Sequence, residues 1–111
     1  MHFMLMFTEP EGDFARREHP EHAPAYWGAW KAYMNAMEEA GILLRGNALQ
    51  APATGATVRV RDGRRTVHDG PYADAKEQLG GYIVIDVADM DAALAWAARA
   101  PCASTAWVEV R

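Results

Sequence analysis

The chain lacks several of the residues and segments on which common kinds of site depend. It has one cysteine, Cys102, among 111 residues, so no internal disulfide and no zinc site built from cysteines can form. No apolar run approaches the ~20 residues that a membrane-spanning helix needs, and a formal net charge of −4 argues against binding to a nucleic-acid backbone. The opening segment has neither the basic start nor the small-residue cleavage site of a secretion signal. We therefore expect a cytoplasmic protein that binds neither membranes nor nucleic acids.

The remaining composition is typical of one small folded domain. Half of the residues are apolar and 23% are charged, which excludes a disordered chain and, at this length, predicts a single domain over residues 1–111. Residues 9–22 mix many charges with two prolines and predict a long loop without a regular element. Apolar spacing predicts strands at 2–8, 42–49, 57–61, 65–69, 81–87 and 105–110, and helices at 23–40 and from Met90 to just before Pro101.

Two of the predicted strands form a hairpin around Asp62-Gly63, a dipeptide that is the strongest short-range hairpin signal. Strand alternation places its valines on an inner face and its arginines outward or near the tip. The arginines could contact a nucleic acid or an anionic partner, but no aromatic platform lies beside them, so we interpret them as a solvated surface. The valines are Val58, Val60 and Val67, and the arginines are Arg59, Arg61, Arg64 and Arg65.

Without the hairpin, the elements follow the order strand, helix, strand, strand, helix, strand. This order predicts an α+β, ferredoxin-like fold, in which a split βαβ antiparallel sheet has both helices on one face and the β-hairpin is an insertion. Because the other face stays open and a small chain has little apolar area to spare, we expect a second copy to cover it in a homodimer. Trp107, with Met4 or Met6, is a candidate for that interface. A small-molecule ligand would bind in the cleft between the sheet and the helices.

Polar residues and glycines crowd residues 68–81, between two apolar strands. Asp69 ends a strand on the side of its inward-facing residues, so its carboxylate is a candidate base. The alternative is that Asp69 opens an Asp-Gly-Pro turn and binds its own backbone amides. Lys76 and Glu77 could assist Asp69 at a bound substrate, or Glu77 could form a capping box with Asp74. The candidate catalytic residues are therefore Asp69, Lys76 and Glu77.

Aromatic residues and glycines supply candidate ligand contacts. The tryptophans of the first predicted helix share one face and either wall an apolar pocket or belong to the core. The glycine pair that opens a central strand allows close approach of a ligand or forms a β-bulge. The candidate ligand-binding residues are Trp27, Trp30, His68, Tyr72, Gly80 and Gly81.

No cofactor and no metal are predicted. His19 and His22 stand among acidic residues, but Pro20 lies between them and the sequence fixes no third ligand. Cys102 has no basic neighbour except Arg99, so a reactive thiolate is not expected.

The segment that holds the candidate catalytic residues, together with its flanks, resembles a known family. Residues 69–72 (DGPY), followed by 73–82 (ADAKEQLGGY), are similar to the signature of the YCII-related proteins of the DGPF type. Similar residues occur at 40–43 before the second strand, at 57–59 in the hairpin and at 89–97 in the second helix. The resemblance covers nearly the whole chain, and it implies a ferredoxin-like fold that dimerises into an αβ barrel.

For function, the resemblance implies several roles. Suggested enzymatic roles in the wider family depend on a histidine and an aspartate, and some members resemble dehydrochlorinases of aromatic breakdown. The first predicted helix here carries no histidine in its body, so a site of the DGPF type would consist of Asp69, Lys76 and Glu77. Relatives also occur in bacteria beside alternative sigma factors, which implies an accessory or sensing role. We therefore expect a bacterial homodimer that binds a small organic molecule, with acid/base chemistry of the lyase or isomerase kind; the alternatives are a non-catalytic sensor and a structural interaction module.

Overall fold

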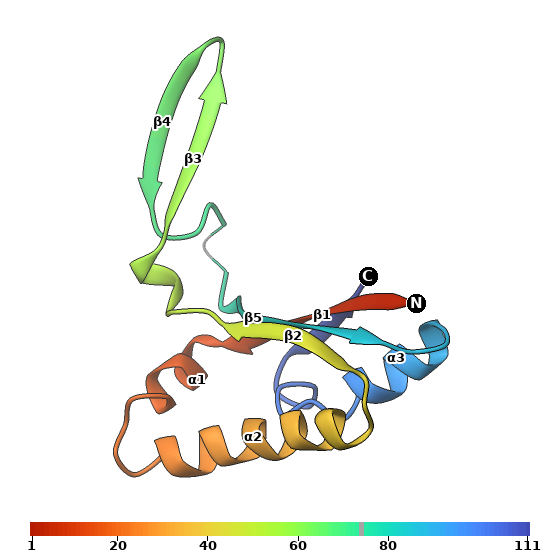
Figure 1. The fold of residues 1–111 in the computed structure, drawn as a ribbon. Helices are drawn as coiled ribbons and strands as arrows, with labels where there is room; N and C mark the ends of the chain where they lie inside the picture. Colours follow the sequence, from red (N-terminus) through yellow and green to blue (C-terminus); the bar gives the residue numbers. More distant parts are fainter. Residues whose placement is uncertain (74) are drawn as a thin grey trace.

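A computed structural model of the protein describes residues 1–73 and 75–111. The chain forms a body and a hairpin that protrudes from it (Figure 1). The body consists of β1 (His2–Pro10), α1 (Glu11–Arg16), α2 (Ala23–Glu39), β2 (Leu43–Ala48), β5 (Glu77–Asp86), α3 (Met90–Ala97) and β6 (Trp107–Val110). The hairpin consists of β3 (Ala56–Arg61) and β4 (Arg64–Asp69), and a short 3-10 turn, η1 (Pro52–Thr54), precedes it.

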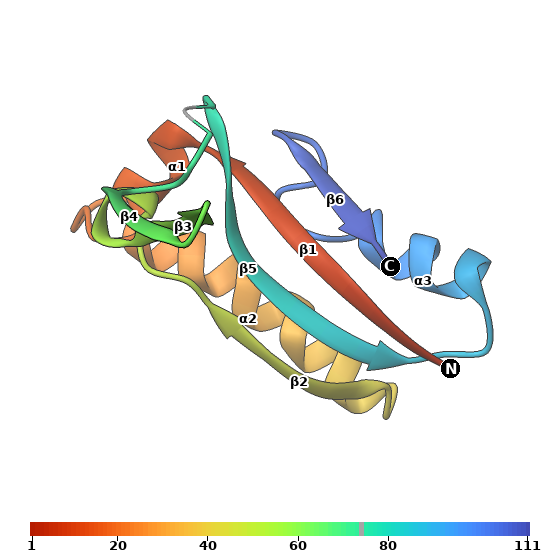
Figure 2. The same ribbon diagram turned by 90° about the horizontal axis from the view of Figure 1, so that it is seen from above.

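The sheet of the body has the strand order of a ferredoxin-like fold. Its four strands lie in the order β2-β5-β1-β6, and each neighbouring pair is antiparallel. β1 and β2 are connected through α2 and are separated in the sheet by β5, which is the split βαβ arrangement. The three described helices all lie on one face of the sheet (Figures 1 and 2). The predicted α+β fold class is confirmed.

The core lies between the sheet and the helices, and strand alternation decides which residues enter it. Phe3, Leu5 and Phe7 of β1 face the helices beside Ile83 and Ile85 of β5, and all five are buried. The helices contribute Tyr33, Met37, Ala93 and Ala97. Among the described residues, no helix combines the length and the apolar character needed to cross a membrane.

Residues 9–22, predicted to be a loop without a regular element, contain a helix. β1 continues through Pro10, and α1 follows at once. Acidic residues occupy the first turn of α1 and Arg16 occupies the last, which suits the helix dipole. Phe14 is buried and anchors this short helix on the body. The prediction was wrong because the run of charges obscured the single apolar residue by which the helix docks.

Three predictions from short sequence patterns are confirmed: the end of the long helix, the hairpin turn and the cap of the second predicted helix. Gly41, after the end of α2, has a φ of 72°, in the left-handed region that favours glycine. Asp62 and Gly63 have φ values of 53° and 72°, as the two central residues of a tight hairpin turn require. Asp89 caps α3, since its carboxylate accepts a hydrogen bond of 2.9 Å from the backbone amide of Ala92.

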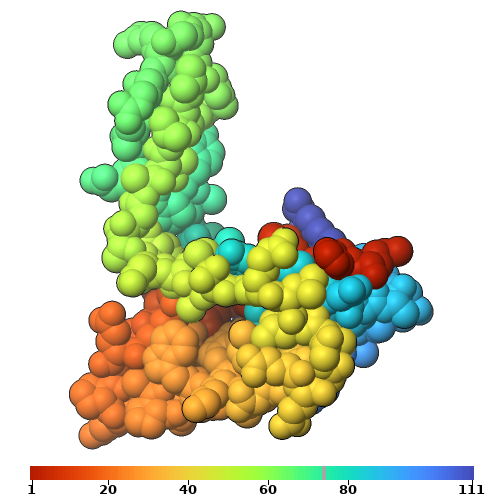
Figure 3. All heavy atoms as spheres, viewed as in Figure 1, coloured from red at the N-terminus to blue at the C-terminus, as the bar shows by residue number. Residues whose placement is uncertain are grey.

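The hairpin, residues 56–69, is called the arm below. It stands away from the body on the side of the sheet opposite the helices (Figures 1 and 3). The radius of gyration is 15.7 Å, against roughly 13 Å for a compact domain of this length. Val58 lies opposite Val67 in the hairpin register, and Val60 lies on the same face. These valines are 59%, 54% and 57% exposed respectively, so the expectation that they face inward is wrong for the single chain.

Apolar side chains are also exposed on two surfaces of the body. Met4 and Trp107 are 38% and 51% exposed and lie with Met6 on the helix-free face of the sheet. They are the residues predicted for a homodimer interface, which stays a prediction. On α3, Met90 and Leu94 were expected on the buried face, but they are 43% and 49% exposed. The smaller alanines of α3 pack against the core instead.

Candidate functional site

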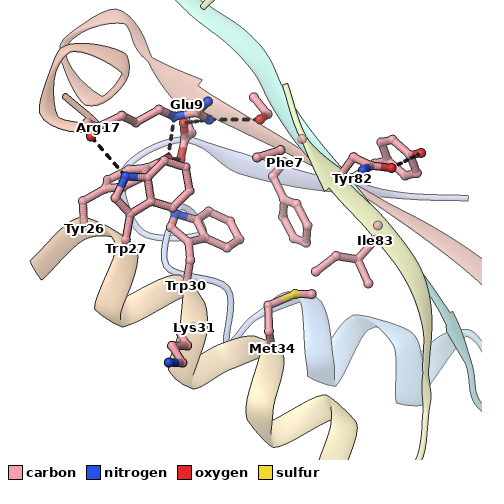
Figure 4. Close-up of a pocket in the computed structure, with 15 residues that line it drawn as sticks. Phe7, Glu9, Arg17, Tyr26, Trp27, Trp30, Lys31, Met34, Tyr82 and Ile83 are labelled. Atoms are coloured by element: carbon pink, nitrogen blue, oxygen red, sulfur yellow. Dashed lines mark hydrogen bonds and ion pairs between the residues drawn. The ribbon is translucent and has the colours of Figure 1, made fainter. Parts of the chain in front are cut away.

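A cavity of about 370 Å³ lies between α2 and the helix-facing side of the sheet (Figure 4). The rings of Phe7 and Trp30 meet edge to face in its wall, with their centroids 4.9 Å apart. The apolar part of the wall consists of Phe7, Trp27, Trp30, Met34 and Ile83. A cavity of this size, walled by aromatic and aliphatic side chains, suits a small and largely apolar molecule.

A cluster of three polar side chains, the buried Glu9 and the partly buried Arg17 and Tyr26, borders the cavity (Figure 4). Glu9 is 1% exposed. Its Oε1 accepts a hydrogen bond of 2.5 Å from the Tyr26 hydroxyl, and its Oε2 accepts one of 2.9 Å from Nη2 of Arg17. Nε of Arg17 donates to the Tyr26 hydroxyl at 3.0 Å. The three side chains therefore satisfy one another, as a buried charge requires.

Arg17 also joins separate elements at this side of the body. Its Nη1 donates to the backbone carbonyl of Leu49, and its Nη2 donates to that of Gly80 at 2.9 Å. The guanidinium carbon lies 4.8 Å from the ring centre of Phe14 and 5.5 Å from that of Trp27, within the range of cation–π attraction. Arg17 thus links α1, α2, β5 and the residue after β2, and its position is set by many contacts at once.

The surroundings of Tyr26 keep its hydroxyl protonated. Burial raises the pKa of Tyr26 well above its ordinary value, and Glu9 raises it further, whereas Arg17 acts in the opposite direction. At neutral pH the hydroxyl is therefore a hydrogen-bond donor to Glu9 and not a base.

Gly80 and Gly81 border the cavity, and close neighbours explain why both are glycines. A Cβ on Gly80 would lie 2.8 Å from Oε2 of Glu9 and 2.9 Å from Nη2 of Arg17. A Cβ on Gly81 would lie 2.9 Å from the backbone oxygen of Asn47. The register of β1 against β5 also shifts at these glycines, so they form a β-bulge as well as a wall of the cavity.

A second cavity of about 250 Å³ shares Glu9, Tyr26 and Trp30 with the first. Its lining is more polar and includes His22 and Cys102. Burial raises the pKa of Cys102 to about 12, so its thiol is neutral at physiological pH. Within residues 1–73 and 75–111, no three or more metal-ligating side chains are grouped so that they could hold an ion.

The first cavity brings together part of the predicted ligand-binding set. Four of the six residues line it, namely Trp27, Trp30, Gly80 and Gly81. His68 is exposed on β4, and Tyr72 is 63% exposed. The Tyr72 hydroxyl accepts a hydrogen bond of 2.6 Å from Arg59, whose guanidinium carbon lies 4.7 Å from the ring centre. Tyr72 therefore packs against the arm rather than against the cavity.

The predicted catalytic residues lie elsewhere. Asp69 ends β4 and is exposed, so the expectation that its carboxylate faces the interior is wrong for the single chain. Lys76 is exposed and Glu77 is half-buried at the start of β5. No ion pair joins Lys76 to Asp69 among the described residues. The alternative in which Asp74 caps a turn with Glu77 lies outside the described residues, and the catalytic role of the three residues remains a prediction.

Sequence reasoning missed Glu9, Arg17 and Tyr26. A signal for Glu9 was present, because it continues the odd-numbered series of core residues in β1, Phe3, Leu5 and Phe7. The predicted strand nevertheless ends at residue 8, because Glu9-Pro10 bounds the apolar run and indicates the start of a loop. For Arg17 the sequence holds no comparable signal, because its four hydrogen-bonded partners come from four other segments.

Comparisons with known proteins place this architecture in a family. Over 59 residues the chain is 44% identical to Uncharacterized protein R00369 of Rhizobium meliloti (strain 1021). The aligned part covers 53% of this chain and 48% of that protein, so the chain spans about half the length of the curated relative it matches. The family model of the YCII-related domain matches residues 1–111, which include the ferredoxin-like body and the arm. With that match over its full length, the chain belongs to the YCII-related domain family.

Proposed function

We propose that the chain binds a small, flat, largely apolar organic molecule in the cavity between α2 and the sheet. The observation that carries this proposal is the wall of the cavity, in which Phe7, Trp27 and Trp30 present aromatic surface beside Met34 and Ile83. Its volume of about 370 Å³ falls within the size of small-ligand sites, roughly 300 to 1,000 Å³. Flat rings stack well on such walls.

The polar groups of the cavity favour a ligand that carries a hydrogen-bond acceptor or a negative charge. Arg17 has five N–H donors. Four of them are used in hydrogen bonds to Glu9, Tyr26, Leu49 and Gly80, which leaves one for a ligand. Lys31 borders the cavity, is exposed and has no ion-pair partner among residues 1–73 and 75–111. A carboxylate or phenolate attached to a ring would supply the missing partner for Lys31.

Binding without turnover is the form of this proposal that the cluster of Glu9, Arg17 and Tyr26 supports best. Both oxygens of Glu9 are engaged, one by Tyr26 and one by Arg17. A general base needs a free oxygen within reach of the proton that it removes. Glu9 therefore acts as a structural partner of Arg17, and a ligand-binding or sensing role needs no rearrangement of the cluster.

Tryptophan fluorescence provides the test. Benzoates and naphthoates are titrated into the protein, and each is paired with its uncharged carboxamide. We expect quenching that saturates, and Trp27→Ala should weaken binding about tenfold because it removes one aromatic wall. Lys31→Gln should weaken the carboxylates and leave the carboxamides unchanged. Trp96→Phe is the matched control, since Trp96 does not border the cavity.

Two outcomes would reject the binding proposal. One is the absence of saturable quenching by every compound in both series. The other is equal weakening by Trp27→Ala and Trp96→Phe, because it would place the ligand outside this cavity.

Acid/base chemistry at Asp69, Lys76 and Glu77 is a separate proposal with its own measurement. The purified protein is incubated with halo-aromatic, lactone and catechol compounds, and products are followed by chromatography. Asp69→Ala should abolish any turnover if the carboxylate is the base. Equal product formation by the wild type and Asp69→Ala would remove Asp69 from the mechanism.

We also propose that two copies pair through the helix-free faces of their sheets. Support comes from Met4 and Trp107, which expose apolar surface at the middle and edge of that face. Sheets that pack face to face bury such side chains between them. Light scattering at micromolar concentration should report twice the 12.2 kDa of one chain. A mass of one chain would contradict the pairing.

A further inference from the structure

One face of the arm carries three exposed valines. Residues that lie opposite each other in the two strands of the arm point to the same side, so each face has its own set of side chains. The face without these valines carries Arg59, which packs on Tyr72. The opposite face carries Val58, Val60 and Val67, each more than half exposed, together with Arg65 opposite Val60 and Asp69 at its base. A β-hairpin alone is marginally stable in water, so a row of valines on a free-standing hairpin indicates a surface that another molecule covers.

Charge is divided unevenly between the arm and the rest of the chain. The arm carries four arginines and two aspartates. The remaining residues hold seven basic and thirteen acidic side chains, so the arm has a formal charge of +2 and the rest of the chain −6. The arm is therefore complementary in charge to the body of the same kind of chain.

The far end of the body is both acidic and apolar. β5 starts at the base of the arm and runs for ten residues to Asp86, about 33 Å at the usual rise per residue. Around that end, five carboxylates are exposed: Glu38, Glu39, Asp86, Asp89 and Asp91. Asp86 is paired with the N-terminal ammonium and Asp89 caps α3, whereas Glu38, Glu39 and Asp91 have no ion-pair partner among the described residues. The half-exposed Met90 and Leu94 of α3 lie among them. This combination, called the acidic end below, matches the arginines and valines of the arm.

We propose that the arm of one copy clasps the acidic end of a second copy. The inference rests on the pairing of helix-free faces proposed above. The arm rises on the same side of the sheet as that face (Figure 1). Six residues per strand make it about 20 Å long, whereas packed sheets lie about 10 Å apart. The tip of the arm therefore passes the partner's sheet and reaches the level of its α3.

Charge selects between the two possible orientations of the pair. A two-fold axis parallel to the strands would set arm beside arm, and eight arginines would gather at one end. An axis across the strands sets each arm over the acidic end of the other copy, where opposite charges meet. Like charges that face each other suppress the wrong arrangement, so the second orientation is the one proposed.

Cross-linking with single cysteines tests the orientation. Arg61 at the tip and Asp91 in the acidic end are each replaced by cysteine in a chain that carries Cys102→Ala. A short bis-maleimide is added, and the products are resolved on a denaturing gel. We expect Arg61→Cys with Asp91→Cys in one chain to give linked dimers, and each single variant to give few. Efficient linking by Arg61→Cys alone would mean that arm meets arm, which overturns the proposal.

Charge reversal tests the energetics. Arg61→Glu with Arg64→Glu should weaken the dimer about tenfold, measured by the concentration dependence of light scattering. Adding Glu39→Lys and Asp91→Lys to the same chain should restore the affinity, because both carboxylates are exposed in the acidic end. If the arm variants leave the dimer unchanged, the arm proposal fails while the pairing of sheets stands. If the wild type has the mass of one chain, both fail, and the ligand-binding proposal is unaffected.

A nucleic acid is the rival partner for the four arginines. A labelled single-stranded oligonucleotide is titrated into the wild type and into the Arg61→Glu, Arg64→Glu variant. Tight binding that the variant loses, with an unchanged dimer, would overturn the proposed clasp.

Discussion

Arg17 in the body and Arg64 in the arm are the same residue type in opposite surroundings. Arg17 is 11% exposed, pairs with a Glu9 side chain that is 2% exposed, and lies against aromatic rings. Arg64 is exposed at the start of β4, and no hydrogen bond or ion pair engages its side chain among the described residues. The first holds elements of one chain together, whereas the second is free to meet another molecule.

The two arginines behave differently because one is shielded from water and the other is not. A buried ion pair cannot exchange its partner for water, so loss of either member leaves a charge without compensation. An exposed guanidinium keeps its hydration and adds little to the stability of its own chain. The body therefore uses charge for positioning, whereas the arginines at the start of β4 remain exposed to water, where the proposed clasp would use them. The predictions below test this contrast from the largest expected effect to the smallest.

The largest effect is expected from Arg17→Ala. This change leaves Glu9 buried without its ion-pair partner, so the free energy of unfolding should fall by roughly 3 to 5 kcal/mol. The matched variant is Arg64→Ala, for which we expect a change within about 0.5 kcal/mol. Both are measured by urea denaturation at one protein concentration. Equal losses in the two variants would contradict the contrast between body and arm.

An intermediate effect is expected from filling Gly80. Its added Cβ would lie 2.8 Å from Oε2 of Glu9 and 2.9 Å from Nη2 of Arg17, so Gly80→Ala must displace the buried pair. We expect a loss of about 1 to 3 kcal/mol.

Gly28→Ala is the matched control for Gly80, because no atom lies within 4 Å of its added Cβ and the residue is exposed inside α2. It should raise stability by about 0.5 to 1 kcal/mol through helix propensity. A loss at Gly28, or a gain at Gly80, would refute the packing argument.

The smallest effect is expected at the exposed pair of the N-terminal ammonium and Asp86. Their 2.7 Å hydrogen bond lowers the pKa of the Asp86 carboxyl. A folded pKa below the unfolded one stabilises the fold above the unfolded value, about pH 4, and this contribution is lost as the pH falls through the folded pKa. The melting temperature of Asp86→Asn should therefore lie slightly below that of wild type at pH 6 and coincide with it near pH 2. A difference in melting temperature that persists near pH 2 would mean that the ion pair of Asp86 is not its cause.

Most elements of the fold could be predicted from short patterns. The Asp62-Gly63 turn, the Gly41 terminus of α2 and the Asp89 cap each depend on a few neighbouring residues, and all three are confirmed. The strand order of the body also followed from the order of elements. The turn, the helix terminus and the cap are local features, so the sequence near each one contains its physical cause.

The candidate site was predicted only in part. Trp27, Trp30, Gly80 and Gly81 border the cavity, and their spacing already indicated a shared face and a close approach. The burial of Glu9 was not predicted, because it depends on Arg17 and Tyr26, which lie 8 and 17 residues away. A charged residue enters a core only when such partners arrive with it.

The amino-acid sequence by itself determined the α+β order of elements, the hairpin and its turn, and the membership of the family. The order of elements and the hairpin arise from hydrophobic spacing and from backbone preferences of single residues, whereas the membership rests on the match to the YCII-related domain. Only the tertiary structure decided that Glu9 is a core residue, that Asp69 stands on an exposed arm and that the valines of the arm face no residue of the body. Whether a residue is buried depends on which distant segments pack against it, and a short stretch of sequence does not contain that information.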